Sequence, residues 1–248
     1  MKVVYSEEFK QVYSYDPASN PGRIEAIEFS LKGKVDFVEP QPAGLEDIAA
    51  VHTQKHIDEV RKEGVYDIAA LAAGGAIKAA QIGLSEPCFA VIRPPGHHAS
   101  ADSAWGFCYF NNMAIAIEKL KREQKIKKVF LLDFDLHVGD GNINLLGQRA
   151  SVEIFNPGGS DRNEYLRTVT DALSKTDADM IAVSAGFDNH EADWGGLLKT
   201  EDYRYMGNLV REAARRNGGG CFGLLEGGYN HAVLGINVLA FIEGLEGK

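Results

Sequence analysis

Continuously apolar runs alternate along this chain with segments in which apolar residues recur at helical spacing. A strand that is covered on both faces is apolar throughout, so the continuous runs indicate buried strands. They predict strands at 3–5, 88–92, 128–134, 151–155, 180–186 and 221–225. The amphipathic segments between them predict helices at 55–63, 66–83, 110–124, 162–175, 200–217 and 229–244.

Alternation of buried strands with helices is typical of the α/β class, in which helices cover both faces of the sheet. We therefore expect a single open, mostly parallel sheet with helices on both faces. No repeat, low-complexity linker or shift in composition divides the chain, so residues 1–248 are expected to form one domain.

Composition changes this picture little, since 45% hydrophobic and 25% charged residues are ordinary for a globular protein. The net charge of −9 disfavours nonspecific nucleic-acid binding and tolerates a cationic small molecule. The N-terminus turns polar after a few residues, and no apolar run approaches a membrane span. We expect a cytoplasmic protein without membrane or nucleic-acid partners, whose oligomeric state the sequence leaves open. Cys88, Cys108 and Cys221 are expected to be buried thiols.

Residues capable of catalysis follow four of the predicted strands. The segments are RPPGHH (93–98), DFDLHVGDG (133–141), AGFDNH (185–190) and EGGYN (226–230). In open α/β sheets, ligands bind beyond the carboxyl ends of the strands. We therefore expect these four segments to form one site.

The second of these segments predicts a metal site. Asp133, Asp135 and His137 alternate with apolar residues, so the period of a strand would place them on one face. Ionisable groups that converge at the end of a buried strand need a compensating cation. Asp188, from another strand end, completes a site for one ion that keeps positions open for water and substrate. Zn²⁺ is the default ion, and Fe²⁺ also accepts these ligands.

The adjacent His97 and His98 are suited to act as general base and general acid beside such an ion. Asp133 and Asp140 are the nearby carboxylates that can orient them. Tyr229 follows two glycines and is placed to offer its phenol to a developing oxyanion.

Several motifs together resemble the histone deacetylase and acetylpolyamine amidohydrolase family. RPPGHHA, GFCYFNN (106–112), LDFDLHVGDGN, SAGFD and EGGYN occur in the order of that family. The segments at 51–60 and 72–80 are similar to its N-terminal region. The resemblance implies the arginase/deacetylase fold and zinc-dependent hydrolysis of an N-acetyl amide.

The resemblance also implies a role for individual residues. It makes Asp135, His137 and Asp188 the zinc ligands, His97 the general base paired with Asp133, and His98 the second histidine paired with Asp140. Tyr229 would polarise the acetyl carbonyl, Gly106 and Phe107 would line the substrate channel, and a structural potassium ion would use Asp133, Asp135 and His137.

Three positions depart from the family pattern. Val138 replaces a second histidine, Trp194 stands where proline is common, and Asn156 replaces an aromatic residue that usually faces Phe107 across the channel. The segment after residue 155 is also short. We therefore expect a more polar channel wall at Asn156 and, as substrate, a small acetylated amine of the acetylpolyamine or acetyl-lysine type.

Two other functions remain open at this point. A dinuclear-manganese ureohydrolase shares the fold, but the tandem histidines and the lone Asp188 argue against it. A catalytically degenerate, deacetylase-like binding protein is disfavoured because every chemical residue is retained. His52 and His56 are expected to have ordinary packing or surface roles.

Overall fold

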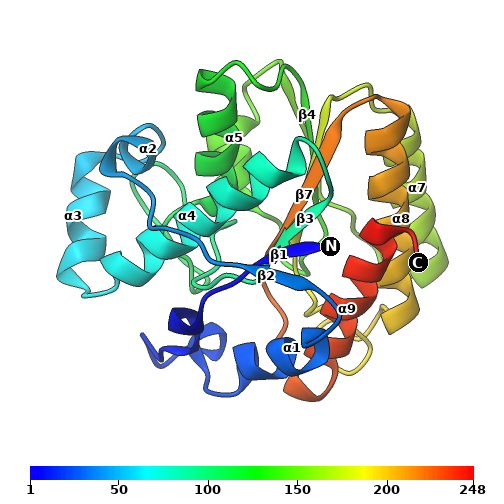
Figure 1. Ribbon diagram of the computed structural model, residues 1–248, viewed down its shortest axis with the longest axis horizontal. Coiled ribbons are helices and arrows are strands. Elements are labelled where there is room, and N and C mark those ends of the chain that lie inside the picture. The colour runs from blue at the N-terminus through cyan, green and yellow to red at the C-terminus, as the bar shows by residue number, and fades with distance from the viewer.

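The computed structural model describes residues 1–248 and contains one seven-stranded sheet (Figure 1). The strand order is β2-β1-β3-β7-β6-β4-β5, and every neighbouring pair is parallel. The strands are β1 Lys2–Val4, β2 Asp36–Val38, β3 Cys88–Ala90, β4 Val129–Asp133, β5 Val152–Phe155, β6 Met180–Ala185 and β7 Gly220–Leu225. The predicted open α/β fold is confirmed, and the sheet is parallel throughout.

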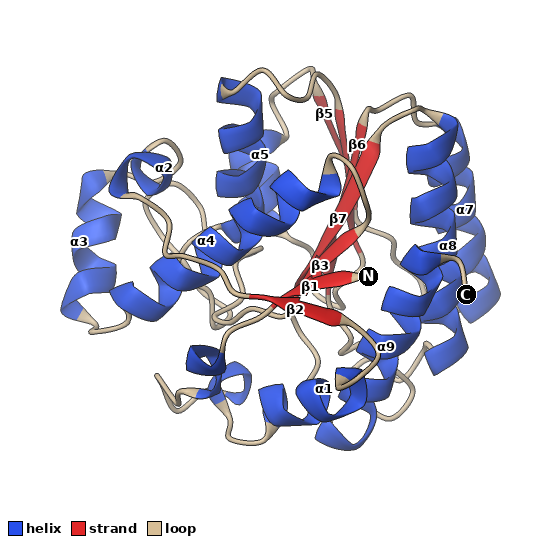
Figure 2. Cartoon of the chain, in the orientation of Figure 1, coloured by secondary structure: helices blue, strands red, loops and turns tan.

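Helices cover both faces of the sheet (Figure 2). One layer contains α2 Leu45–Ala49, α3 Gln54–Lys62, α4 Tyr66–Gly83, α5 Asn112–Arg122 and α6 Asp140–Leu146. The other contains α1 Arg23–Leu31, α7 Arg162–Lys175, α8 Thr200–Arg216 and α9 His231–Glu246. No helix is both long and apolar enough to cross a membrane.

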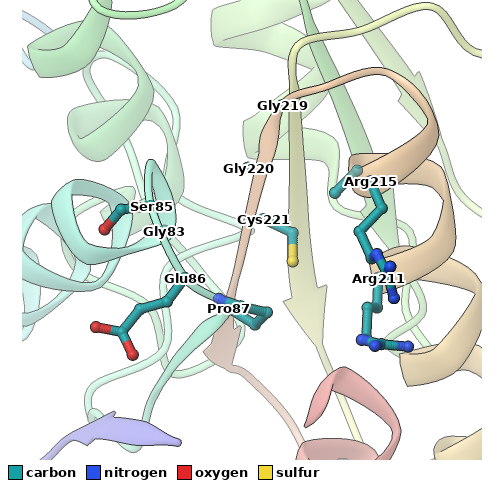
Figure 3. A pocket seen from close by; sticks show the side chains of 10 residues that line it. Gly83, Ser85, Glu86, Pro87, Arg211, Arg215, Gly219, Gly220 and Cys221 are labelled. Carbon is teal, nitrogen blue, oxygen red and sulfur yellow. The ribbon is translucent and has the colours of Figure 1, made fainter. Parts of the chain in front are cut away.

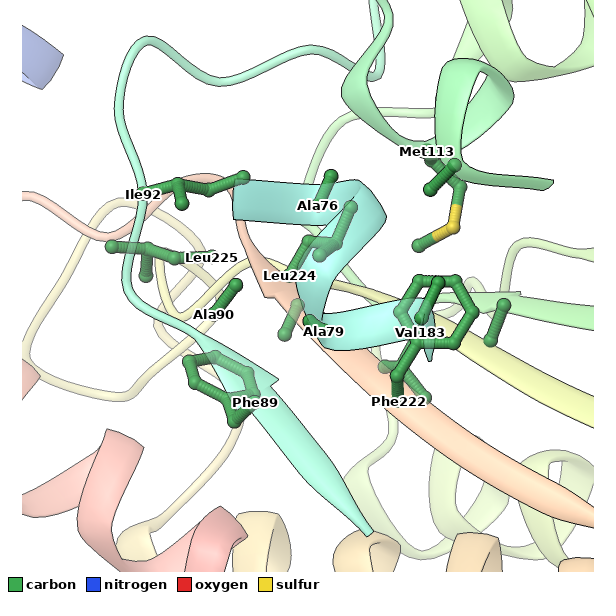
Figure 4. Close-up of a cluster of buried hydrophobic side chains, with 14 of the residues drawn as sticks. Ala76, Ala79, Phe89, Ala90, Ile92, Met113, Val183, Phe222, Leu224 and Leu225 are labelled. Carbon is green, nitrogen blue, oxygen red and sulfur yellow. The ribbon is translucent and has the colours of Figure 1, made fainter. Parts of the chain in front are cut away.

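The core is continuous because small residues let α4 approach the sheet closely. Ala76 and Ala79 of this helix lie against Leu224 and Phe222 of β7 (Figure 4). Residues of β7 such as Phe222 are fully buried, as expected for a strand covered on both faces. The three cysteines are free and buried, as predicted.

Short elements account for most differences from the prediction. The sequence pattern did not predict β2, α1, α2 or α6. β2 has only three residues, two of them exposed, so it offers no apolar run to recognise. α6 has the sequence DGNINLL, whose glycine and asparagines are poor helix formers. The predicted strand 128–134 ends at Asp133, so Asp135 and His137 lie in the loop that follows it.

The four segments with catalytic residues follow β3, β7, β6 and β4, which are adjacent in the sheet. Their carboxyl ends therefore bring these segments to one edge. A different cavity, of about 150 Å³, lies at the opposite edge beside Arg211, Arg215 and Cys221 (Figure 3). Its one carboxylate, Glu86, is paired with Lys2 at 2.6 Å. The residues predicted to be catalytic lie at the carboxyl edge.

Candidate active site and metal centre

Asp135, His137 and Asp188 converge at the carboxyl edge of the sheet. They offer ligand atoms that all lie within 4.8 Å of one another. Nδ1 of His137 lies 3.3 Å from Oδ1 of Asp135 and 3.2 Å from Oδ2 of Asp188. The structure thus brings together the residues that were predicted to bind a metal, although Asp135 and His137 lie in the loop after β4 and not on a strand face.

Backbone amides hold the two carboxylates in place. Oδ1 of Asp188 accepts from the amide of Leu136, and Oδ2 of Asp135 accepts from the amide of Gly227, at 3.0 and 2.8 Å. Gly227 can approach this closely only because it lacks a side chain: a Cβ there would lie 2.6 Å from Oδ2 of Asp135 and 2.8 Å from Oδ2 of Asp188. The turn after β7 therefore closes the floor of the metal site.

The charge of this group fits a divalent cation. Asp135 and Asp188 are 5% and 0% exposed, and no lysine or arginine pairs with either. Oδ2 of Asp188 is buried and makes no hydrogen bond, despite its contact with His137. Burial and the charge of Asp135 raise the pKa of Asp188 to about 6. A cation bound to these atoms would satisfy the unpartnered oxygen and relieve the repulsion.

His97 is enclosed by carboxylates. Its Nδ1 lies 3.3 Å from Oδ2 of Asp133, and its Nε2 lies 3.8 Å from Oδ1 of Asp135. Burial opposes a positive charge on His97, but the charges of Asp135 and Asp133 outweigh it and raise the pKa of His97 well above its usual value. Asn142 donates to the same oxygen, Oδ2 of Asp133, at 3.0 Å and so also holds this carboxylate.

His98 has a different environment. Its Nδ1 lies 2.6 Å from Oδ1 of Asp140, as the predicted pairing requires. Burial, together with the neighbouring His97, lowers the pKa of His98 to about 4. His98 is therefore neutral at pH 7, with its Nδ1 proton donated to Asp140 and its Nε2 free to accept a proton.

Both histidines line a cavity of about 100 Å³ that opens beside the metal ligands. Its wall is largely aromatic and contains Trp105, Phe107, Trp194 and Tyr229. Phe107 has a φ of 68°, which few residues with a side chain adopt. Its ring meets that of Tyr229 edge-on, with centroids 5.9 Å apart.

Tyr229 is held from two sides. The indole of Trp194 stacks on its ring at 4.1 Å. Burial raises the pKa of its phenol well above the usual value, so the hydroxyl stays protonated and can donate a hydrogen bond. The buried Arg23 donates to the carbonyls of Gly228 and Glu226, at 2.8 and 2.5 Å, and so holds the turn that carries Tyr229.

Asn156 does not line this cavity, in contrast to the expectation from sequence. Its side-chain oxygen accepts from the amide of Gly139 at 3.0 Å, which directs it toward the loop after His137. The expectation that Asn156 makes the wall more polar is therefore wrong. Gly106 and Phe107 do line the cavity, as expected.

Other residues at the site have no motif that would single them out. Oε2 of the buried Glu226 accepts from the amides of Gly96 and His97, at 2.7 and 3.2 Å, and so fixes the turn before the tandem histidines. Glu226 and Asn142 could be found from sequence only as parts of EGGYN and LDFDLHVGDGN, and Arg23 carried no signal.

The remaining histidines lie outside the metal group. His52 and His56 are buried, and their rings pack against Phe110 at 5.3 and 6.0 Å. Nε2 of His52 accepts from the amide of Asn111, and a ring nitrogen of His56 contacts the carbonyl of Tyr109. Their predicted packing role is confirmed.

Comparison with known proteins agrees with this geometry. The family described as "Histone deacetylase domain" matches residues 18–157 and 143–245. A "Probable deacetylase" of Methanothermobacter thermautotrophicus is 30% identical, over 100% of this chain and 91% of that protein. A "Histone deacetylase-like amidohydrolase" of Pseudomonas aeruginosa is 30% identical, over 88% of this chain and 72% of its own length. The crystal structure of the HDA15 HD domain has a TM-score of 0.84 and 25% identity, covering 99% of this chain and 89% of that one.

Proposed function

Because the chain belongs to the histone deacetylase family and is a hydrolytic deacetylase, we propose that it removes acetyl groups from small acetylated amines with one zinc ion. Asp135, His137 and Asp188 would hold this ion. The observation that carries the proposal is that the tandem histidines line the same small cavity as His137 and Tyr229.

In the proposed reaction, individual residues of the chain have distinct roles. A divalent ion at this site, when bound, polarises a carbonyl and lowers the pKa of water. Although the family resemblance suggests His97 as the general base, His98 is better suited, since it is neutral at pH 7 and firmly oriented by Asp140. Its Nε2 would take the proton from the attacking water and return it to the leaving amine. His97, paired with Asp133 at 3.3 Å, would stabilise negative charge when it is protonated.

Tyr229 would complete the site by donating its phenolic hydrogen to the acetyl oxygen. The raised pKa of Tyr229 keeps its phenol protonated at neutral pH. A potassium ion at Asp133, Asp135 and His137 is proposed from the family resemblance. It is supported by the buried Oδ1 of Asp133, which has no partner.

The substrate proposal rests on charge and cavity shape. The net charge of −9 attracts cationic amines through long-range steering that weakens with salt. Trp105, Phe107 and Trp194 provide an apolar wall for a methylene chain, in which each buried CH₂ contributes about 0.8 kcal/mol. The loop between β5 and α7 spans only residues 156–161, so we expect it to contribute little to holding a long peptide.

The test compares kcat/KM for an acetylated diamine, free acetyl-lysine and a long acetyl-lysine peptide, using protein reconstituted with zinc. We expect the peptide to gain less than about tenfold, equivalent to about 1.4 kcal/mol of transition-state binding, from its flanking residues. A larger gain would refute the small-amine assignment. Hydrolysis of none of the three would refute the proposed function.

Metal analysis separates this function from the ureohydrolase alternative. The residues Asp135, His137 and Asp188 are the one group of three or more metal-capable side chains in the structure. We expect one zinc ion per chain in the active protein. Two tightly bound manganese ions per chain would favour the ureohydrolase instead.

A further inference from the structure

Trp105 lies immediately before the GFCYFNN motif and contacts both members of the His98–Asp140 pair. Its indole Nε1–H donates to Oδ2 of Asp140 at 2.9 Å, while Oδ1 of the same carboxylate accepts from His98 at 2.6 Å. We propose that Trp105 is a positioning residue that holds Asp140 so that Asp140 orients His98. This inference rests on the proposed function, because it concerns the general base of that reaction.

Asp140 needs such a partner because its side chain is 44% exposed. A carboxylate open to water can rotate and exchange its hydrogen bonds with solvent. The indole N–H occupies the second oxygen of Asp140 and thereby fixes the plane of the carboxylate. Burial alone would raise the pKa of Asp140, but the hydrogen bonds from His98 and Trp105 lower it overall, which keeps Asp140 ionised.

The indole ring also restrains His98 directly. It lies on the imidazole with centroids 3.9 Å apart and an interplanar angle of 33°. The imidazole also contacts the ring of His97, with centroids 4.0 Å apart. The ring of His98 therefore packs against two rings, those of His97 and Trp105, while its Nδ1 binds the carboxylate that Trp105 holds.

Trp194 provides the matched comparison, since it is the other tryptophan of the chain and lines the same cavity. Its ring is 52% exposed, against 55% for Trp105. It stacks on Tyr229 and has no hydrogen bond to Asp140. The two tryptophans thus have similar exposure but contact different catalytic groups.

A double-mutant cycle tests the proposal. Trp105→Phe keeps a ring on His98 and removes the N–H. We expect it to lower kcat about fivefold to tenfold while KM changes less than about threefold, because orientation of the base affects the chemical step. In an Asp140→Ala background the same substitution should change kcat less than about twofold, since its partner is gone.

Trp194→Phe should instead change kcat by the same factor in the wild-type and the Asp140→Ala backgrounds. Equal effects of Trp105→Phe in both backgrounds, or an effect confined to KM, would overturn the proposal and leave Trp105 as a wall of the cavity. Unchanged kinetics in Trp105→Phe would overturn it as well.

Proton NMR gives a readout that does not depend on turnover. The His98 Nδ1–H, hydrogen-bonded at 2.6 Å, should give a downfield resonance that is absent from Asp140→Ala. In Trp105→Phe we expect this resonance to exchange faster with water; an unchanged exchange rate would overturn the positioning role. If the wild-type protein shows the resonance and its dependence on Trp105 but hydrolyses no acetylated amine, the proposed function fails and the positioning contact stands.

Discussion

Gly106→Ala is expected to lower activity strongly, by more than its effect on stability explains. A Cβ at this position would lie 2.4 Å from Cδ2 of His98, whereas carbon atoms in contact are normally about 3.5–4.0 Å apart. His98 cannot move away freely, because its ring packs against those of Trp105 and His97 and its Nδ1 is bound to Asp140. The conflict therefore requires a shift of about 1 Å, and a misplacement of that size costs about 100-fold in rate. We expect kcat/KM on an acetylated amine to fall by about that factor.

The backbone contributes a separate and smaller effect. Gly106 has a φ of 59°, where alanine costs about 1–2 kcal/mol. For a chain of this size, that corresponds to a fall in Tm of about 2–8 °C. Thermal unfolding followed by circular dichroism would measure this fall.

Gly218→Ala is the matched control for Gly106→Ala. Gly218 has a φ of 64° and no atom within 4 Å of the position of a Cβ, so its substitution introduces the same backbone strain without a clash. We expect a similar fall in Tm and an unchanged kcat/KM. If Gly106→Ala kept kcat/KM within about threefold of this control, His98 would be able to shift without loss of activity. That result would refute the prediction that its position is fixed by its neighbours.

Three further predictions concern the metal, the phenol and a buried histidine. His137→Ala or Asp188→Ala should abolish zinc retention and turnover. Asp133→Asn should keep most of the zinc and lose activity, because Asp133 contacts His97. Full activity with one zinc per chain in either alanine variant would contradict the assigned site. Tyr229→Phe should lower kcat by about two to three orders of magnitude with little change in the affinity of a hydroxamate inhibitor, and near-normal turnover would show that the phenol does not reach the substrate. Burial lowers the pKa of His52 to about 4 from its ordinary 6.5, so the unfolded chain binds a proton in that window and the folded protein does not. Stability from this group is complete above pH 6.5 and falls with pH, so the free energy of unfolding in urea should drop by about 2 kcal/mol more from pH 7 to pH 5 in the wild type than in His52→Gln, and equal drops would contradict the assignment.

The sequence was sufficient to predict the fold because buried parallel strands are apolar on both faces and so are visible as runs. It was sufficient to predict that Asp135, His137 and Asp188 converge, because they follow such runs directly. It could not predict β2, whose short exposed pattern resembles a loop, or α6, whose residues favour turns.

Contacts that depend on the conformation of a loop could not be predicted from the sequence. Asn156 was expected at the channel from its neighbouring Pro-Gly, but its hydrogen bond to Gly139 directs it elsewhere. Trp105 and Arg23 contact the site across long stretches of chain, through an indole N–H and a buried guanidinium that no local pattern marks. Their positions follow from tertiary structure alone.

The place of β7 in the sheet has a consequence for how the protein is made. β7 lies between β3 and β6, so before residues 220–225 emerge from the ribosome, β2-β1-β3 and β6-β4-β5 share no strand pairing. The tandem histidines then belong to one half of the sheet, and Asp135, His137 and Asp188 belong to the other. We therefore expect a nascent chain to remain unable to bring the histidines beside these three residues until β7 has been synthesised. Insertion of this late strand would then join the halves, complete the core and assemble the active site in one event.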